Sequence, residues 1–424
     1  MNLLVIGGGG RENALVWKLS QSPMAEKIYA IPGNPGMEGM ADIVDDIDVL
    51  DNAAVTEFAK SHDIGLAVVG PEAPLANGVV DALSEAGIKT FGPTKAAAEI
   101  EVSKAFSKML MEKYGIPTAK YKVFSDIVSA REYVRQEGAP IVIKADGLAA
   151  GKGVTVAMTL DEALEALDII MSDKTFGDAG SRVVIEEYMR GEEVSVLCFA
   201  DGENAVQMVP SQDHKCAYDG DRGPNTGGMG TYAPAPVATP EIRQRVQEEI
   251  IDPVMEAMRK EGRPYKGCLY AGLMITDEGP KVVEFNARFG DPETQVVLPL
   301  LEGDLVSIML ACIDGKLKEQ EINWSKGAAV CVVMASGGYP KAYGKGYQID
   351  GINDAISDNC LVFHAGTAKK DGKVVTNGGR VLGVVGRGAE IREAVDAAYA
   401  GVADISFKAE FHRNDIAHRA LERL

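Results

Sequence analysis

The sequence predicts a multidomain protein that combines α/β and α+β folds. Its 424 residues exceed what one hydrophobic core usually holds. At the N-terminus an apolar run, a glycine cluster and a helical stretch follow one another, as in a doubly wound sheet. The residues from 327 onward are instead rich in strand-like segments. We therefore expect a doubly wound domain over residues 1–102, a central domain over residues 103–326 and a small strand-rich domain over residues 327–424.

The first domain should consist of alternating strands and helices. Residues 2–6 predict a buried strand, residues 7–10 are glycines, and residues 11 to about 20 favour a helix. Apolar runs at residues 27–31 and 65–70 predict further strands, with a helix over residues 79–86. This order is typical of parallel strands joined by helices.

The central and C-terminal regions show a different pattern. A helix over residues 104–114 should end at the Gly-Ile-Pro of residues 115–117, and strands then alternate with a helix up to residue 187. We expect residues 210–236, rich in Gly, Pro, Asn and Asp, to form a long ordered loop. Later elements are predicted as follows: a helix at 240–260, strands at 267–275 and 281–286, and helices at 303–317 and 390–400.

Composition and charge exclude several classes of protein. The chain has 43 basic and 62 acidic residues, and its net charge of −19 opposes binding to nucleic acid or anionic membranes. No apolar run approaches the roughly 20 residues of a membrane span, and the N-terminus lacks the pattern of a signal peptide. The six cysteines are scattered without a CxxC pair, which suits free thiols in a reducing compartment. We therefore expect a cytoplasmic protein with small-molecule partners.

The glycine run at residues 7–10 does not match a dinucleotide-binding fingerprint. The third glycine of that fingerprint would fall at Glu12, and no acidic residue ends the next strand. Glycines can let the backbone approach a phosphate, with the following helix N-terminus supplying amide donors. A tight turn between strand and helix explains the run equally well.

A second glycine cluster, at residues 144–153 (KADGLAAGKG), is more informative. It differs from a phosphate-binding Walker loop because its glycine spacing is one residue short and Gly153 stands where Ser or Thr is required. The residues that follow favour a strand rather than a helix. A glycine loop between two strands can fold as a flap over a triphosphate, with Lys144 offsetting its charge. A plain hairpin turn would not need this many glycines and lysines.

The segment at residues 284–286 (EFN) is a candidate magnesium site. Side chains alternate along a strand, so Glu284 and Asn286 should share one face, with Val283 and Phe285 on the other. A carboxylate beside an amide oxygen is a ligand pair suited to Mg²⁺. An isolated pair of this kind is more often a solvated strand face, but here Arg288 and further acidic residues follow at once.

Acidic residues around position 190 form a weaker candidate. The sequence Glu186-Glu187-Tyr188-Met189 is followed closely by Glu193. A strand edge there could bind adenine through backbone groups, with a carboxylate reaching the ribose. Acidic pairs are usually solvated, so these residues alone decide little.

These segments occur in the chain order of the ATP-grasp superfamily: a first lysine (Lys104), a second lysine (Lys144), a glycine flap, a hinge and an ExN strand. Further motifs are more specific and cover nearly the whole chain. The sequence resembles the glycinamide ribonucleotide synthetase family in these motifs: residues 7–12 (GGGGRE), 70–75 (GPEAPL), 144–154 (KADGLAAGKGV), 213–215 (DHK), 223–230 (GPNTGGMG), 284–293 (EFNARFGDPE) and 376–382 (TNGGRVL).

The resemblance implies a pre-ATP-grasp N-terminal domain and an ATP-grasp domain with a small mobile flap subdomain at about residues 121–190. It implies that ATP, glycine and phosphoribosylamine are converted through a glycyl phosphate to glycinamide ribonucleotide, ADP and phosphate, in purine synthesis. Mg²⁺ or Mn²⁺ would be the cofactor and the protein would be a monomer. No covalent nucleophile of the protein is needed.

The resemblance also implies roles for individual residues. Catalysis would use Lys144, Arg288 and Asp291, and the metal would bind Glu284 and Asn286. The implied ATP-binding residues are Lys104, Lys144, Gly147, Gly151, Lys152, Gly153, Glu186, Glu187, Tyr188, Met189 and Glu193. The implied substrate-binding residues are Gly8, Gly9, Gly10, Glu72, Asp213, Arg288, Asp291 and Arg380. Arg380 fits a phosphate through its guanidinium, although a plain turn before a strand is an equally good explanation.

Two positions depart from the family pattern. Asn13 stands where the family usually has His, and Cys216 stands where it usually has Arg. A proton-transfer role at the first position and a phosphate contact at the second are therefore in doubt. Asn13 can still donate and accept hydrogen bonds, whereas Cys216 carries no positive charge.

Two other functions stay open at the level of sequence. One is a related purine-pathway ligase that uses formate or bicarbonate, against which residues 223–230 and the tail from residue 327 argue. The other is a nucleotide sensor or a nicotinamide-dependent dehydrogenase built on the first domain. The missing ribose-binding acid argues against a dehydrogenase, and the full set of catalytic residue types argues against a passive sensor.

Overall fold

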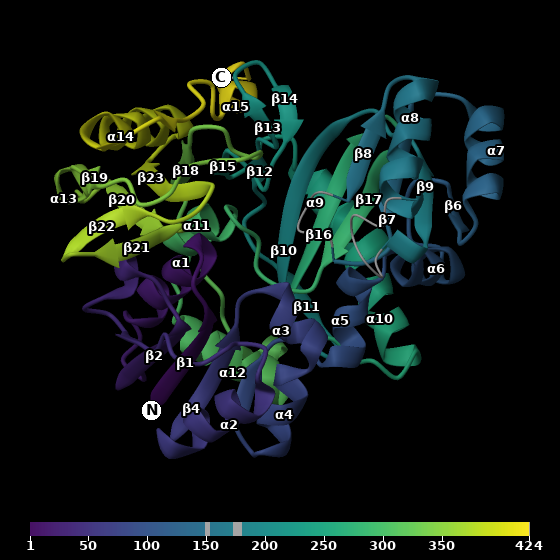
Figure 1. The fold of residues 1–424 in the computed structure, drawn as a ribbon. Coiled ribbons are helices and arrows are strands. Elements are labelled where there is room, and N and C mark those ends of the chain that lie inside the picture. The colour runs from purple at the N-terminus through teal and green to yellow at the C-terminus, as the bar shows by residue number, and fades with distance from the viewer. Residues whose placement is uncertain (149–152, 173–179, 424) are drawn as a thin grey trace.

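The computed structural model describes residues 1–148, 153–172 and 180–423 (Figure 1). Its N-terminal part is a parallel sheet in the order β3-β2-β1-β4-β5, which confirms the predicted doubly wound domain. The strands are β1 (Asn2–Gly7), β2 (Lys27–Pro32), β3 (Asp42–Ile43), β4 (Ile64–Val69) and β5 (Lys89–Phe91). The helices are α1 (Gly10–Leu19), α2 (Asn52–Ser61), α3 (Glu72–Asn77), α4 (Val79–Glu85) and α5 (Lys95–Val102).

This sheet is buried on both faces, which explains the continuous apolar run in β1. Leu4 and Ile6 belong to one hydrophobic cluster, whereas Leu3 and Val5 belong to another. Successive side chains of a strand point to opposite faces, so a strand covered on both sides needs no polar positions. The strand therefore delivers residues 7–10 to the carboxyl edge of the sheet, where ligands of such folds bind.

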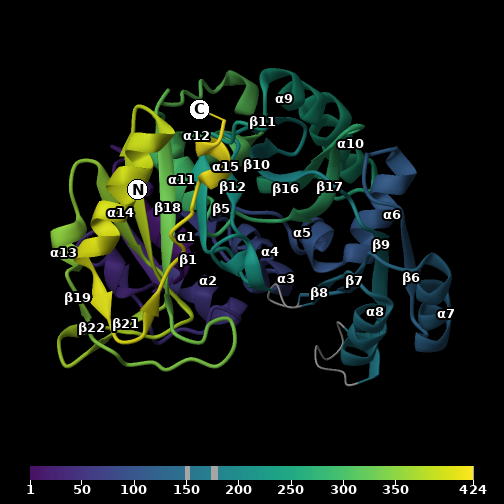
Figure 2. The ribbon, with the colours of Figure 1, turned by 90° about the horizontal axis from the view of Figure 1, so that it is seen from above.

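A small four-stranded antiparallel unit follows α6 (Lys104–Tyr114), in the order β6-β9-β7-β8. It comprises β6 (Tyr121–Phe124), α7 (Ile127–Glu137), β7 (Ile141–Ala145), β8 (Val154–Ala157), α8 (Leu160–Leu167), a π turn at Asp168–Ser172 and β9 (Val183–Glu187). Its buried apolar residues form a core of their own. Figure 2 shows this unit projecting from the rest of the molecule.

A second antiparallel sheet, in the order β11-β10-β16-β17, faces the small unit. Its strands are β10 (Glu192–Asp201), β11 (Ala205–Gln207), β16 (Lys266–Thr276) and β17 (Gly279–Asn286). The helix predicted over residues 240–260 is present as α9 (Pro240–Val246), a π turn at Gln247–Ile251 and α10 (Asp252–Lys260). The helices α11 (Thr294–Val297) and α12 (Leu305–Asp314) follow β17, and α12 packs against β5, β10 and β16.

The prediction of a long loop over residues 210–236 is wrong. This stretch contains β12 (Gln212–Asp213), β13 (Cys216–Tyr218), β14 (Arg222–Asn225) and β15 (Gly230–Ala233). The strands are two to four residues long and rich in Gly and Pro, so no local periodicity reveals them. Within this stretch β12 pairs with β15 and β13 with β14, and β15 also pairs with a distant strand, Thr231 with Cys331.

The strand-rich C-terminal region shares its sheet with that stretch. The sheet has the order β12-β15-β18-β23-β20, and β25 also pairs with β18. The strands of the tail are β18 (Ala328–Ser336), β19 (Ile349–Asp350), β20 (Cys360–His364), β21 (Thr367–Lys370), β22 (Lys373–Thr376), β23 (Arg380–Gly388), β24 (Ser406–Phe407) and β25 (Glu410–Phe411). Its helices are α13 (Ile352–Ala355), α14 (Ile391–Asp404) and α15 (His418–Leu421).

Two sequence-based expectations can be compared directly with the structure. All six cysteines are free, and five of them are buried. None of the helices in the described part of the chain combines the length and the apolar character that a membrane crossing needs.

Candidate active site

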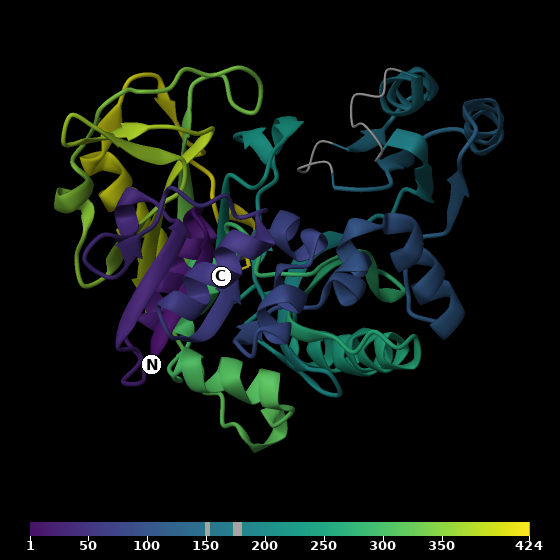
Figure 3. The same cartoon turned by 60° about the horizontal axis from the view of Figure 1, so that its bottom comes forward.

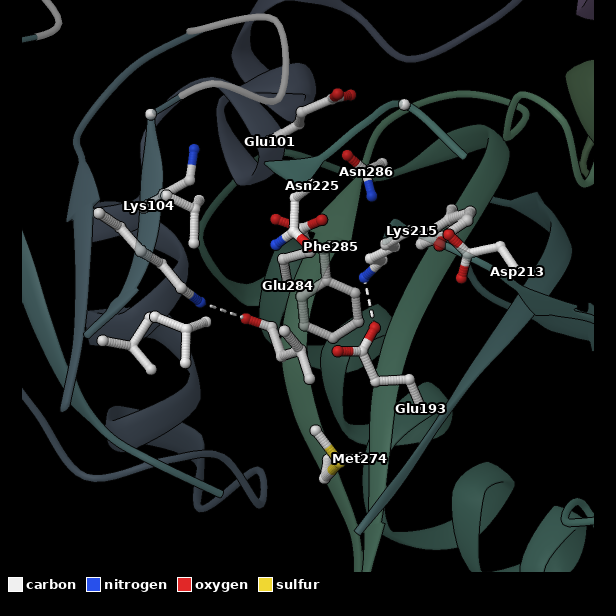
Figure 4. A pocket seen from close by; sticks show the side chains of 18 of the residues that line it. Glu101, Lys104, Glu193, Asp213, Lys215, Asn225, Met274, Glu284, Phe285 and Asn286 are labelled. Carbon is white, nitrogen blue, oxygen red and sulfur yellow. Dashed lines mark hydrogen bonds and ion pairs between the residues drawn. The ribbon is translucent and has the colours of Figure 1, made fainter. Parts of the chain in front are cut away.

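A cavity of about 700 Å³ lies between the small antiparallel unit and the second sheet and extends toward the N- and C-terminal regions. Its lining divides into two parts, which we name after the ligands that the sequence resemblance implies for them. The nucleotide end is lined by Lys104, Lys108, Lys144, Gly147, Gly153, Glu186, Glu187, Tyr188 and Met189. The acceptor end is lined by Arg11, Glu72, Asp213, Arg288, Asp291 and Arg380. Glu193, Lys215, Glu284 and Asn286 lie between the two (Figure 4).

The glycine loop that follows β7 begins beside the start of α6. Asp146, just beyond β7, accepts hydrogen bonds from the Ala105 amide at 3.0 Å and the Ser103 hydroxyl at 3.1 Å, at the start of α6. This contact places the Lys104 ammonium 3.3 Å from the carbonyl oxygen of Gly147. Gly147 has φ +152°, which favours glycine. Gly153 lines the cavity, whereas the predicted positions Gly151 and Lys152 lie outside the described residues.

Lys144 is buried and held on two sides. Its ammonium donates to the Val283 carbonyl at 3.0 Å and lies 2.9 Å from the Glu186 carboxylate. The other Glu186 oxygen lies 3.0 Å from the ammonium of Lys108. Glu186 is therefore a buried partner of two lysines, and the sequence-based view of the acidic pair as solvated fails for it. Glu187 instead accepts a hydrogen bond from the Lys120 amide at 3.0 Å.

Lys108 was not among the predicted site residues. Burial lowers its pKa to about 8, against the opposing effect of Glu186. It also donates to the Thr118 hydroxyl at 2.8 Å. The sequence did hold a clue, because Lys108 follows Lys104 by four residues and so lies on the same face of α6.

Glu284 and Asn286 both line the cavity and come from one face of β17, as predicted. A register shift in the pairing of β16 with β17 falls between Val282 and Glu284, so Val283 is the extra residue of a β-bulge. Val282 and Phe285 are buried, and Val283 and Phe285 both line the cavity.

The electrostatics of Glu284 suit a metal ligand. Burial favours a raised pKa, but the charges of Lys215, Lys144, Lys104 and Arg288 outweigh it and lower the pKa of this carboxyl. The group is thus ionised at neutral pH. No cluster of three or more His, Cys, Asp or Glu side chains suited to a metal is found among residues 1–148, 153–172 and 180–423. The protein would then supply the carboxylate and the Asn286 amide oxygen, as Mg²⁺ bound to phosphates commonly requires.

Arg288 is tied to carboxylates from the N-terminal region. Its guanidinium lies 3.3 Å from Glu72 and 3.1 Å from Glu101, and it donates to the Asn286 amide oxygen at 3.4 Å. Glu101 also accepts a hydrogen bond from the Ala287 amide at 2.6 Å. Burial raises the pKa of Glu101, although Arg288 opposes the effect. Glu101 was not predicted, since nothing near it in sequence marks it as part of the site.

Asp213 is the last residue of β12, and Lys215 lies just after this strand. Both side chains line the cavity. Lys215 forms a short ion pair with Glu193 (Figure 4). Burial raises the pKa of Asp213 to about 7; Lys215 opposes this, and Glu293 and Glu193 add to it. Lys215 belongs to the DHK motif, but the sequence did not predict it as a site residue. Its neighbours only become apparent once β10 lies beside β12.

Asp291 joins three regions of the chain. One carboxylate oxygen lies 3.4 Å from the Arg380 guanidinium and accepts from the Gln295 amide at 2.8 Å, and the other lies 3.4 Å from the Arg11 backbone nitrogen. Arg380 also donates to the carbonyl oxygens of Asp291 at 2.7 Å and Gly227 at 2.8 Å. Arg380 lines the cavity, and its guanidinium is already bound to the Asp291 carboxylate and to two carbonyl oxygens.

The predicted glycines of the first turn are packed rather than exposed to the cavity. Gly8, Gly9 and Gly10 are not among its lining residues, whereas Arg11 is. A β-carbon at Gly8 would lie 2.5 Å from the Gly33 carbonyl oxygen, and one at Gly10 would lie 2.6 Å from the Gln295 amide nitrogen. Close packing is thus sufficient to explain why glycine occupies these two positions.

Comparison with known proteins decides the family. Family models of phosphoribosylglycinamide synthetase match the N domain at residues 1–101, the ATP-grasp (A) domain at residues 102–294 and the C domain at residues 329–419. The chain belongs to the phosphoribosylglycinamide synthetase family. Phosphoribosylamine–glycine ligase of Vibrio parahaemolyticus is 54% identical over 100% of this chain and 99% of its own length. That of Pasteurella multocida is 52% identical with the same coverage.

Solved structures agree with this family assignment. The crystal structure of phosphoribosylamine–glycine ligase from Thermotoga maritima has a TM-score of 0.86 at 34% identity and covers 98% of this chain and 100% of that chain. The biotin carboxylase domain of Hydrogenobacter thermophilus 2-oxoglutarate carboxylase, solved with magnesium ADP, has a TM-score of 0.74 at 16% identity over 97% and 91%. At that identity it shows a shared fold only.

The two departures from the synthetase pattern have structural explanations of different kinds. Asn13 is buried between the N- and C-terminal regions, where its side chain accepts from the His364 amide at 2.7 Å and donates to the Gly36 carbonyl at 3.2 Å. Both of its polar atoms are therefore used in joining the regions. Cys216 lines the cavity, and its thiol lies 3.7 Å from the Asn225 amide oxygen. Burial raises the pKa of this thiol, so it stays neutral.

Proposed function

We propose that this protein joins glycine to phosphoribosylamine at the expense of ATP, giving glycinamide ribonucleotide, ADP and phosphate. One observation carries the proposal: a single cavity brings together the lysines of the nucleotide end, the Glu284 and Asn286 pair, and the charged residues of the acceptor end. Full-length relatives at 51–54% identity that bear the name phosphoribosylamine–glycine ligase support it.

The first step would be phosphorylation of glycine. A carboxylate is a poor acyl donor because oxide is a poor leaving group. Attack of a glycine carboxylate oxygen on the γ-phosphorus forms a C–O–P linkage and releases ADP. Such a transfer depends chiefly on positioning and charge neutralisation. Lys104 and Lys144 would neutralise phosphate oxygens, because both ammonium groups line the nucleotide end.

Glu284 and Asn286 would hold the divalent cation. When bound, Mg²⁺ would supply a Lewis acid that offsets the negative charge of phosphate oxygens. The ionised state of Glu284 and the position of both side chains on the cavity side of β17 favour this assignment. Mn²⁺ would suit the same oxygen ligands.

The second step would be attack by the phosphoribosylamine nitrogen on the glycyl carbonyl carbon, with expulsion of phosphate. We assign the acceptor end to this step. Asp213 and Asp291 would face the glycine ammonium, Arg288 its carboxylate, and Arg380 the phosphate of phosphoribosylamine. Glu72 and residues 8–10 would orient the ribose, although the packing of these glycines leaves Arg11 as the nearest cavity residue of that turn.

The glycyl phosphate must be protected from water. We assign this role to the loop at residues 147–153, and adenine binding to residues 186–189. We also propose that the protein acts as a cytoplasmic monomer and binds neither nucleic acid nor membranes, as its net charge of −19 favours. Residues 1–102, 103–326 and 327–424 remain our proposed division, with a flap unit at about 121–190.

ADP release from the purified protein with Mg²⁺ tests the function. We expect release only when glycine and phosphoribosylamine are both present. Release with formate in place of glycine would instead identify a related ligase, and hydride transfer to a nicotinamide would identify a dehydrogenase. Light scattering of the eluted protein would test the monomer.

A further inference from the structure

The hairpin formed by β13 and β14 is attached to the cavity at both of its ends. In the described part of the chain its two strands pair only with each other and form a separate two-stranded sheet. Asp213 and Lys215 precede it, Asn225 is its last residue and Gly227 follows it, and all four line the cavity. The place of this hairpin therefore affects several cavity residues at once. Figure 3 shows it between the C-terminal region and the small antiparallel unit.

The hairpin is held by the last residues of the chain, through Arg413. This side chain is fully buried. Its guanidinium donates to the Cys216 carbonyl at 3.1 Å and to the Asp221 carboxylate at 2.9 Å. It therefore binds both strand β13 and the turn between β13 and β14. The remaining donors form two bonds of 2.7 Å with the Asp415 carboxylate. A buried guanidinium with all of these partners is costly to replace by a smaller group, because the carboxylates would lose their countercharge.

Further hydrogen bonds join the turn of the hairpin to residues 414–419. Asp219 accepts hydrogen bonds from the backbone amide and the side-chain amide of Asn414, at 2.8 and 3.0 Å. The Gly220 amide donates to Asp415 at 2.8 Å, and Arg419 donates to Asp221 at 2.6 Å. Contact with His214, and then Arg413 and Arg419, lowers the pKa of Asp221, so this carboxylate remains charged.

The C-terminal segment is itself fixed to the C-terminal core. The hydroxyl of Tyr399, on α14, donates to the Arg413 carbonyl at 2.8 Å and accepts from the Ile416 amide at 3.1 Å. Ile416 and Ala417 are buried in the hydrophobic cluster of that region. Figure 1 shows α15 beside β13 and β14. The hairpin thus has a rigid support outside the ATP-grasp sheets.

We propose that residues 413–419 form a clamp that positions the hairpin, and that Arg413 is a positioning residue for the acceptor end of the cavity. Through the hairpin it fixes Lys215 beside Asp213 on one side, and on the other the Gly227 carbonyl that holds Arg380. The nucleotide end, built on α6, β7 and β9, receives none of these contacts in the described part of the chain.

Steady-state kinetics of Arg413→Lys test this proposal, which rests on the proposed function for its assay. A lysine keeps one charge but cannot reach Asp221, Asp415 and the Cys216 carbonyl together. We expect KM for glycine and phosphoribosylamine to rise about tenfold, with KM for ATP changed less than about twofold. Equal rises in all three, or a fall in kcat alone, would overturn the proposal. Arg392→Ala, an exposed arginine of α14, is the matched control and should leave all constants unchanged.

A milder pair of variants covers the case in which Arg413→Lys fails to fold. Asp219→Ala removes both hydrogen bonds from Asn414, and Asn414→Ala removes the one from its side chain. We expect Asp219→Ala to raise KM for glycine about threefold, Asn414→Ala to raise it less, and the double variant to be no worse than Asp219→Ala. Additive effects would mean that the two residues act separately, against the proposal.

Hydrogen exchange separates the clamp from the enzymatic assignment. In Arg413→Lys and Asp219→Ala, amides of residues 216–225 should exchange faster than in the wild-type protein, while those of β10 and β16 keep their rates. Unchanged exchange in the hairpin would refute the clamp. A wild-type protein without ligase activity would refute the proposed function alone, since the exchange result does not depend on turnover.

Discussion

The two ends of the cavity use charge in different ways. At the nucleotide end, Lys108 and Lys144 share one buried carboxylate, Glu186, and Lys104 donates to the Gly147 carbonyl, so positive charge is left for a ligand. At the acceptor end, Arg288 and Arg380 already contact carboxylates from distant parts of the chain, namely Glu72, Glu101 and Asp291. The first arrangement is suited to neutralising phosphates. The second holds its groups in fixed positions, which suits recognition of a small zwitterion.

This contrast implies that single substitutions should act differently at the two ends. Under the proposed function, a residue of the nucleotide end would contribute its own charge to the reacting phosphates, so its loss should lower kcat. A residue of the acceptor end belongs to a network, so its loss should mainly weaken the binding of one substrate. The following expectations run from the largest effect to the smallest.

Glu284→Ala should have the largest effect, because it removes the ionised ligand between the two ends. We expect kcat to fall by about a thousandfold or more, as for loss of a principal electrostatic group. Circular dichroism should show an intact fold. Glu278→Ala, an exposed carboxylate on the β16–β17 hairpin, is the matched control. Near-normal turnover of Glu284→Ala would remove the metal assignment.

Lys144→Met should lower kcat by about a hundredfold, since one cation close to the reacting phosphate is lost. Single-turnover measurement of ADP formation would give the rate. Lys122→Met, the control, removes an exposed lysine from the same antiparallel unit and should leave kcat unchanged. If Lys144→Met changed only the KM for phosphoribosylamine, the division of the cavity into two ends would be wrong.

Arg380→Ala should raise KM for phosphoribosylamine by about tenfold, the usual cost of one charged hydrogen bond, with little change in kcat. Initial rates at varied phosphoribosylamine would measure it. Arg387→Ala, on the same strand β23 but outside the cavity lining, serves as control. An unchanged KM would leave Arg380 with only its structural contacts to Gly227 and Asp291.

The smallest effect concerns pH. The pKa of Asp213 is raised to about 7, so its carboxylate becomes neutral as the pH falls through that value. Between pH 7.5 and 6.5 the charged fraction drops about threefold, and KM for glycine should rise by about the same factor. Asp213→Asn should abolish this dependence. A glycine KM that follows pH equally in that variant would contradict the role of Asp213.

Much of the fold followed from local pattern. The run of apolar residues in β1 predicted a strand, and the glycine loop between β7 and β8 was placed between two strands. The short strands β12 to β15 could not be predicted, since they are too short for a periodic pattern and β15 pairs with the distant β18. The β-bulge in β17 could not be predicted either, because it becomes apparent only in the pairing of β17 with β16.

The sequence by itself determined the residue types of the site and their order, because motifs such as residues 144–153 and 284–293 fix local chemistry. Tertiary structure alone decided which charges meet. Glu101 reaches Arg288, Lys108 shares Glu186 with Lys144, and Arg413 reaches the hairpin at Asp221. Such contacts join residues up to 192 positions apart in the chain. Burial then sets their strength, because buried charges are shielded little by water.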